Sequence, residues 1–214
     1  HFQKNVYHLQ THTGDNIGFV LRLVMDQMRK IGGCLFADLF QANDQDRLLK
    51  FKPVDFETRN EMLHKLASKL RYESDLECLK GWRNERYSVY SDKKPYVLVE
   101  RALSGVLGII TYGVHVNGYV FDETSKEIKF WIPRRSASKP TWPLMLDNIV
   151  AGGIGYPYGI HETVIKESME EANLPQSLVE ESIKPVGVVS YFHFQGDIEN
   201  DNFESESSFI TGEV

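Results

Sequence analysis

Three glutamates are placed where they could share one metal ion. Glu170 and Glu171 follow Glu167 by three and four positions. At about 100° per residue, this spacing places the three side chains on one face of a helix. Carboxylates at this spacing repel one another by roughly a few tenths of a kcal/mol per pair, and a hard divalent cation would relieve that repulsion. The spacing predicts a Mg²⁺ site, with Mn²⁺ as an alternative ion.

An ordinary surface helix is the alternative interpretation of the same residues. Lys166 stands four positions after Glu162 and four before Glu170, a spacing at which opposite charges stabilise an exposed helix. The other side of the helix is predicted to collect the residues that pack against the protein, which are Val164, Ile165, Ser168, Met169 and Ala172.

Four glycines lie between residues 152 and 159, just before this helix. Glycine lets the backbone turn tightly and approach a ligand closely, and no helix breaker interrupts residues 161–172. We therefore expect a loop, a helix and a second loop, with Gly152 and Gly153 bringing the backbone close to the metal. A tight turn without a ligand is the alternative for these two glycines.

The segment from Gly152 to Leu174 resembles the Nudix box, G-x5-E-x7-R-E-U-x-E-E-x-G-U, in which U is an aliphatic residue. Aligned without gaps, Glu167 falls on the glutamate of the R-E pair, and Glu170 and Glu171 fall on the E-E pair. The resemblance implies a Nudix hydrolase in which these three glutamates bind Mg²⁺. It also implies that Glu167, Glu170 and Lys166 are catalytic.

Four positions depart from the box. Tyr158 replaces its first glutamate, Lys166 its arginine, Ser168 an aliphatic residue and Asn173 its last glycine. Lysine keeps the charge of arginine without its bidentate fork, and asparagine is the next best residue for the left-handed conformation that ends a helix. With these departures, a non-catalytic binding protein is an alternative to an enzyme.

Segments outside the box resemble the Nudix proteins related to thiamine pyrophosphokinase, namely residues 81–90, 112–119, 131–136 and 139–148. This resemblance implies an α/β (α+β) protein with an N-terminal accessory domain and a Nudix α/β/α sandwich built on a mixed sheet. It also implies hydrolysis of thiamine diphosphate, preferentially of oxothiamine and oxythiamine diphosphate, to the monophosphate and phosphate. The alternatives are a hydrolase for another nucleoside diphosphate derivative and a non-catalytic protein that binds thiamine diphosphate.

The densest basic cluster consists of Arg134, Arg135 and Lys139. These residues could clamp the oxygens of a diphosphate substrate, and ordinary surface charge is the alternative. Trp142, like Trp131, could stack on the ring of a substrate or belong to the core. We expect His115, within an alternating strand, to be structural.

Hydrophobic periodicity predicts the elements that carry these residues. We expect helices over 17–28, 62–70 and 97–107, a strand near 34–40, and a hairpin in which residues 122–127 turn between two strands. We place the domain boundary near Ile110, which gives an accessory domain at 1–110 and a Nudix domain at 111–214. The second domain looks incomplete, because its strand-like end at 208–214 is not followed by the further strands and helix of a Nudix fold.

The chain has 214 residues and a formal net charge of −6. An acidic chain is a poor binder of nucleic acids and of anionic membranes, so a small-molecule diphosphate is the expected partner. Cys34 and Cys78 have no metal-ligand spacing and are expected to be reduced thiols. These features favour a cytoplasmic protein, with a removed organellar targeting peptide as the alternative. The sequence does not specify the oligomeric state.

Overall fold

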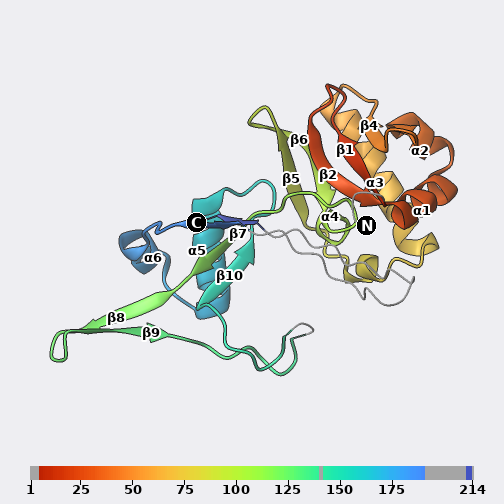
Figure 1. Cartoon of the computed structure of the whole chain (residues 1–214). Coiled ribbons are helices and arrows are strands. Elements are labelled where there is room, and N and C mark those ends of the chain that lie inside the picture. The colour runs from red at the N-terminus through yellow and green to blue at the C-terminus, as the bar shows by residue number, and fades with distance from the viewer. Residues whose placement is uncertain (1–4, 140–141, 191–210, 214) are drawn as a thin grey trace. The chain divides into compact units, whose positions relative to one another are not determined.

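The structure is a computed structural model that describes residues 5–139, 142–190 and 211–213 (Figure 1). The chain divides into two compact units after Thr111, and the second unit includes residues 112–190 and 211–213. The fold is mixed α/β and contains several small sheets.

The first unit is built on a four-stranded sheet in the order β2-β1-β4-β3. β1 pairs antiparallel with β2 and parallel with β4, and β3 pairs antiparallel with β4. The strands are β1 (Val6–Gln10), β2 (Asn16–Leu21), β3 (Phe40–Asn43) and β4 (Leu48–Phe51). The helices beside them are α1 (Arg22–Gly32), α2 (Cys34–Leu39) and α3 (Phe56–Glu73).

The longest helix of the first unit is α3, which confirms the helix expected over 62–70. Asp55 caps its N-terminus by accepting a hydrogen bond from the backbone nitrogen of Thr58 at 2.7 Å. Leu63, Leu66 and Leu70 are buried along one stripe of the helix, the pattern of an amphipathic helix that packs on a core.

Three local predictions for this unit are wrong. Residues 16–21 form a strand that pairs with β1, and the helix expected from Ile17 begins only at Arg22. The segment expected as a strand near 34–40 is mostly the helix α2. Residues 94–100 form the strand β6 (Lys94–Glu100), where a helix was expected from Val97.

β6 pairs antiparallel with β5 (Arg86–Ser91) and contacts α3. Val97, Leu98 and Val99 are all buried, so both faces of this strand are covered. The sequence of such a strand is a continuous apolar run without alternation. Periodicity alone does not distinguish such a run from a segment of a buried helix. Two short elements flank this pair, η2 (Glu77–Gly81) and α4 (Arg101–Ser104).

A buried arginine joins α3 to β6. Arg59 is 3% exposed, and its Nε and Nη2 donate to the carbonyl oxygen of Tyr96 at 2.9 and 2.7 Å. Its Nη1 donates to the carbonyls of Pro53 and Val54, and its guanidinium lies 3.7 Å from the centre of the Tyr96 ring. One side chain thus satisfies three backbone carbonyls and holds the loop before α3 against β6.

The second unit pairs β7 (Gly113–Val116) with β10 (Val150–Gly153), and both strands contact the helix α5 (Ile160–Ala172). The remaining elements are α6 (Gln176–Ser182), the hairpin β8 (Gly118–Asp122) and β9 (Glu127–Trp131), and the pair β11 (Val188–Ser190) and β12 (Thr211–Glu213). Within the described ranges these strands form three separate two-stranded sheets, where a single mixed sheet was expected.

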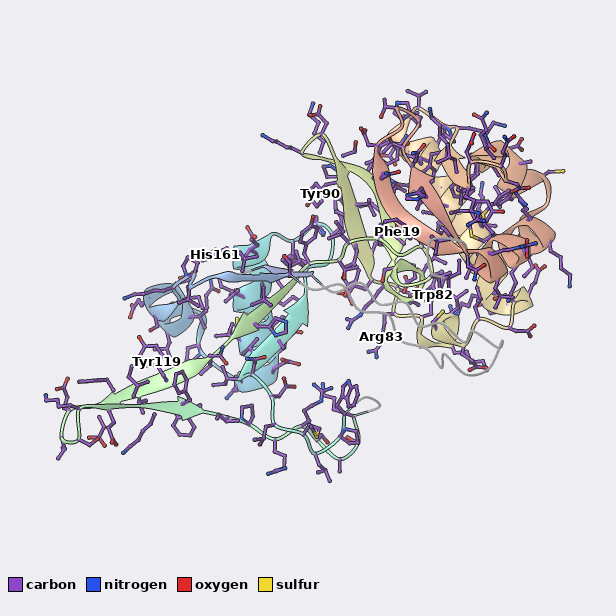
Figure 2. All side chains as sticks on the ribbon, in the orientation of Figure 1. Phe19, Trp82, Arg83, Tyr90, Tyr119 and His161 are labelled. Carbon is purple, nitrogen blue, oxygen red and sulfur yellow. The ribbon has the colours of Figure 1, made fainter. Side chains whose placement is uncertain are left out.

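The hairpin of β8 and β9 is confirmed, with its turn at residues 123–126. Tyr119 lies opposite Phe130, and Phe121 lies opposite Ile128, so all four share one face. Each of them is at least 48% exposed, and Figure 2 shows Tyr119 on this ribbon.

The C-terminal part of the second unit contains a short strand where one was expected. Of the expected strand 208–214, residues 211–213 form β12 and the others lie outside the described residues. No helix in the described part of the chain is both long and apolar enough to cross a membrane.

We expect Arg59→Met to destabilise the protein by about 2–4 kcal/mol, because three carbonyl groups lose a buried donor. Urea unfolding of the two proteins measures the difference. Lys69→Met removes a cation from an exposed position of the same helix and should change stability by less than about 0.5 kcal/mol. Equal stability of Arg59→Met and the wild type would show that Arg59 does not hold the loop in place.

Candidate metal and diphosphate site

The helix α5 confirms the helix expected over 161–172, and both of its ends are capped. The side chain of Glu162 accepts a hydrogen bond from the backbone nitrogen of Gly159 at 3.1 Å. At the other end Asn173 adopts the left-handed conformation, with φ 51° and ψ 35°, as expected for asparagine in place of glycine. Glu162 is therefore a capping residue.

The face of α5 that packs on the unit carries two of the three glutamates. Val164, Glu167, Ser168 and Glu171 follow the spacing i, i+3, i+4, i+7, which places them on one helix face. Val164 and Ser168 are buried, and the side chain of Glu167 is only 17% exposed. Met169, which was expected to pack with them, is 48% exposed.

Glu167 lies directly against the backbone of Gly152. A Cβ atom added at Gly152 would stand 2.5 Å from Cγ, 2.6 Å from Cδ and 2.9 Å from Oε2 of Glu167. Contacts this short exclude any side chain at position 152 while Glu167 keeps its place. The glycine is part of the strand β10, so its role is a close approach to α5 and not the turn of a loop.

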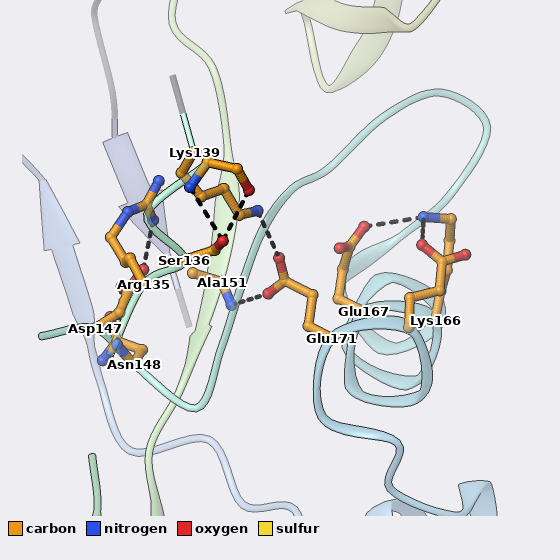
Figure 3. A network of polar contacts seen from close by, with 11 residues as sticks. Arg135, Ser136, Lys139, Asp147, Asn148, Ala151, Lys166, Glu167 and Glu171 are labelled. Atoms are coloured by element: carbon orange, nitrogen blue, oxygen red, sulfur yellow. Dashed lines mark hydrogen bonds and ion pairs between the residues drawn. The ribbon is translucent and has the colours of Figure 1, made fainter. Parts of the chain in front are cut away.

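Glu171 binds the backbone of the preceding residue in the same strand. Its Oε2 accepts a hydrogen bond from the backbone nitrogen of Ala151 at 3.1 Å, and its Oε1 lies 3.9 Å from Nζ of Lys139 (Figure 3). Glu167 and Glu171 therefore occupy adjacent positions along β10, one turn of helix apart.

Lys166 connects the other two glutamates. Its Nζ donates to Oε2 of Glu170 at 2.8 Å and to Oε1 of Glu167 at 3.0 Å. These bonds raise the pKa of the Lys166 ammonium group above its ordinary value, and the bond to Glu170 has the larger effect. Lys166 thus remains charged and orients both carboxylates, while the side chain of Glu170 is 59% exposed.

No group of three or more His, Cys, Asp or Glu side chains that could hold a metal ion occurs among the described residues. The expected convergence of Glu167, Glu170 and Glu171 on one patch is therefore not found. Mg²⁺ is often held by one or two carboxylates, with water and substrate phosphates completing its coordination. Glu167 and Glu171 fit that mode of binding. They lie along one strand, and Glu167 contacts that strand at Gly152.

The basic cluster is divided between two roles. Arg134 donates from Nη1 to the carbonyl of Leu144 at 2.7 Å, and Arg135 forms an ion pair with Asp147. Both arginines thereby join the two ends of the segment 134–147. Of the three, Lys139 is the one whose ammonium group contacts a glutamate of α5 (Figure 3).

The other expected site residues are spread over the unit. Trp142 and Trp131 are 69% and 63% exposed, so neither belongs to the core. Gly153 pairs with Gly113 in the two-stranded sheet. His115 contacts Oδ1 of Asn148 through Nδ1 at 3.1 Å.

Sequence reasoning missed two features of this site. The backbone nitrogen of Ala151 binds Glu171, and no side-chain pattern could have indicated it. Ser168 is buried, and its Oγ has no hydrogen-bond partner within the described part of the chain. Ser168 occupies a position that is aliphatic in the box, and from this the burial of its hydroxyl could have been predicted.

Comparison with known proteins gives one family match. A family model described as a domain of unknown function (DUF4743) matches residues 5–111. These residues are half of the chain and correspond to the first unit.

Three curated relatives are similar to longer parts of the chain. The uncharacterized protein YJR142W of Saccharomyces cerevisiae is 56% identical over 213 residues, which are 100% of this chain and 62% of the yeast protein. Nudix hydrolase 20, chloroplastic, of Arabidopsis thaliana is 36% identical over 184 residues, 82% of this chain and 47% of its own length. Nudix hydrolase 24, chloroplastic, of the same plant is 40% identical over 113 residues, 52% of this chain and 30% of its own length.

The match to Nudix hydrolase 20 must extend into both units, because it covers 82% of this chain while the first unit ends near its middle. The chain is thus related to Nudix hydrolases at moderate identity. It spans less than two thirds of the length of each of these relatives.

We expect Gly152→Ala to weaken Mg²⁺ binding at least tenfold, because the new methyl group would displace the carboxylate of Glu167. Calorimetric titration with MgCl₂ measures the affinity. Gly187→Ala is the matched control, since a Cβ atom there meets nothing within 4 Å. Unchanged affinity in a folded Gly152→Ala protein would exclude Glu167 as a ligand in this position.

Proposed function

The chain belongs to the family defined by the domain of unknown function DUF4743, and from its relation to Nudix hydrolases we propose that it forms part of a divalent-metal-dependent diphosphate hydrolase. The observation that carries the proposal is the placement of Glu167 and Glu171 against β10. Both are glutamates of the box, and both contact consecutive residues of one strand, Gly152 and Ala151.

The proposed roles follow from these contacts. Glu167 and Glu171 bind Mg²⁺ or Mn²⁺, which when bound supplies charge neutralisation for the diphosphate and lowers the pKa of a coordinated water. Lys139, 3.9 Å from Glu171, binds a phosphate oxygen of the substrate. Lys166 holds Glu170 and Glu167 in place, and Glu170 orients the attacking water.

The proposed substrate is the diphosphate of a thiamine derivative, preferentially oxothiamine or oxythiamine diphosphate. The water oxygen forms a bond to the terminal phosphorus, and the bond from that phosphorus to the bridging oxygen breaks. The products are the monophosphate and inorganic phosphate. The resemblance of segments 81–90, 112–119, 131–136 and 139–148 to the thiamine-related Nudix proteins supports this choice. The exposed ring of Trp142 is available to stack on a heterocycle.

A non-catalytic thiamine-diphosphate-binding protein is the second candidate. Tyr158, at the place of the first glutamate of the box, is 48% exposed and supplies no carboxylate. Calorimetric binding of thiamine diphosphate without turnover at any divalent metal would favour this candidate. Faster turnover of nucleotide sugars than of thiamine compounds would favour a hydrolase for another nucleoside diphosphate derivative.

We expect the full-length protein with Mg²⁺ to release phosphate from oxothiamine diphosphate, and Glu171→Gln to reduce kcat/KM about 100-fold or more, since mutating catalytic electrostatic groups has effects of roughly this size. A phosphate-release assay measures both. Glu181→Gln, an exposed position outside the site, is the matched control. Release by Glu171→Gln at the wild-type rate would disprove the role of Glu171, and absence of release from the wild type would disprove the enzyme.

We expect Lys139→Gln to raise KM for the diphosphate substrate about tenfold with a smaller change in kcat, because a charged hydrogen bond to substrate contributes roughly 1.5–3 kcal/mol. Steady-state kinetics separates the two constants. Arg134→Gln should leave KM close to the wild-type value, since Arg134 donates to the carbonyl of Leu144. The reverse order of effects would assign substrate binding to Arg134.

A further inference from the structure

The hairpin of β8 and β9 carries an apolar face that is largely open to solvent. This face consists of Tyr119, Phe121, Ile128 and Phe130, which point to the same side of the two strands. Each of the four side chains is between 48% and 61% exposed, and every residue of β9 is exposed. A pair of strands in isolation is at most marginally stable in water. We therefore expect a further surface to cover the apolar face.

The exposed area of this face is large enough for a specific interface. A half-exposed aromatic side chain presents on the order of 100 Å², so the four residues together present roughly 500 Å². That area is near the upper end of the range for the largest apolar patch on a monomeric protein. Two copies joined through this face would bury about 1,000 Å², the lower bound for a specific protein interface. The area thus suffices for a reversible dimer.

The charges of the hairpin are paired with one another, away from the centre of the apolar face. Asp122 and Lys129 lie on the opposite face and form an ion pair at 2.6 Å. At the turn, Lys126 forms an ion pair with Glu123 at 2.7 Å, and its Nζ lies 5.8 Å from the centre of the Phe121 ring. A charge-free centre with paired charges at its edge is typical of protein interfaces. Two such faces meet without like-charge repulsion.

An interface between two identical chains on a two-fold axis uses the same surface twice, so this surface must complement itself. An uncharged apolar face meets this condition, because the hydrophobic effect is not directional. The rings of Tyr119 and Phe130 already pack against each other across the two strands, with centres 6.3 Å apart. This contact orders both side chains before association, which lowers the entropy lost on binding.

We propose that the protein forms a reversible two-fold dimer in which the apolar faces of two β8–β9 hairpins pack against each other. The proposal is independent of the proposed hydrolase activity, because none of the four residues is one of the glutamates of α5 or a residue that contacts them.

Sedimentation velocity of the full-length protein over a dilution series tests the proposal. We expect the wild type to change from dimer to monomer on dilution. Phe121→Asp should raise the dissociation constant of the dimer at least tenfold, because symmetry places the new charge on both sides of the interface. Ile128→Lys, on the same face, should have an effect of similar size.

Val120→Asp is the matched control. Val120 is adjacent to Phe121 in β8 and equally accessible, with 46% exposure against 48%, but it lies on the opposite face. This variant should dimerise as the wild type does. All three substitutions are at exposed positions, so thermal unfolding at a concentration where each protein is monomeric should give similar midpoints and verify that the variants are folded.

Three results would each overturn the proposal. The first is a wild-type protein that stays monomeric at every concentration, which would assign the apolar face to a different partner. The second is a dissociation constant that neither Phe121→Asp nor Ile128→Lys changes. The third is a loss of dimer in Val120→Asp equal to that in Phe121→Asp.

Discussion

The contact between Glu167 and the backbone of Gly152 determines the arrangement of the candidate site. Glu167 can be mostly buried beside a strand because position 152 has no side chain. This contact sets the distance between α5 and β10, and at that distance Glu171 reaches the backbone nitrogen of Ala151. The charge of Glu171 is then close enough to Lys139 for an ion pair. A glycine in a strand thus allows one acidic group to lie against the strand and brings a second acidic group near a basic one.

The sequence was sufficient for those elements whose hydrophobic pattern is formed within one segment. The helix α5 has caps at both ends, and Asn173 ends it in the conformation expected from its side chain. The hairpin of β8 and β9 shows the alternation of a strand on both sides of a polar turn. α3 carries a capping Asp55 and one apolar stripe. In each case the local preference and the tertiary structure agree.

The errors occur where distant residues decide the structure. Ile17 and Val20 suit either a strand or a helix, and antiparallel pairing with β1 selects the strand. Val97 to Val99 are covered on both faces, by α3 among others. In the site, helical spacing placed three glutamates together, but pairing with Lys166 separates the environment of Glu170 from that of Glu171. Backbone donors such as the nitrogen of Ala151 have no signature in a sequence.

The buried hydroxyl of Ser168 has a consequence for how the protein could change. An unpaired hydroxyl in an apolar environment costs roughly 1–3 kcal/mol, a large share of the net stability of an ordinary domain. Ser168 lies on the same face of α5 as Glu167 and Glu171, yet it contributes no hydrogen bond to them among the described residues. Replacing Ser168 with an apolar residue of similar size would remove this cost, and the stability gained would offset the loss caused by substitutions at the neighbouring acidic groups.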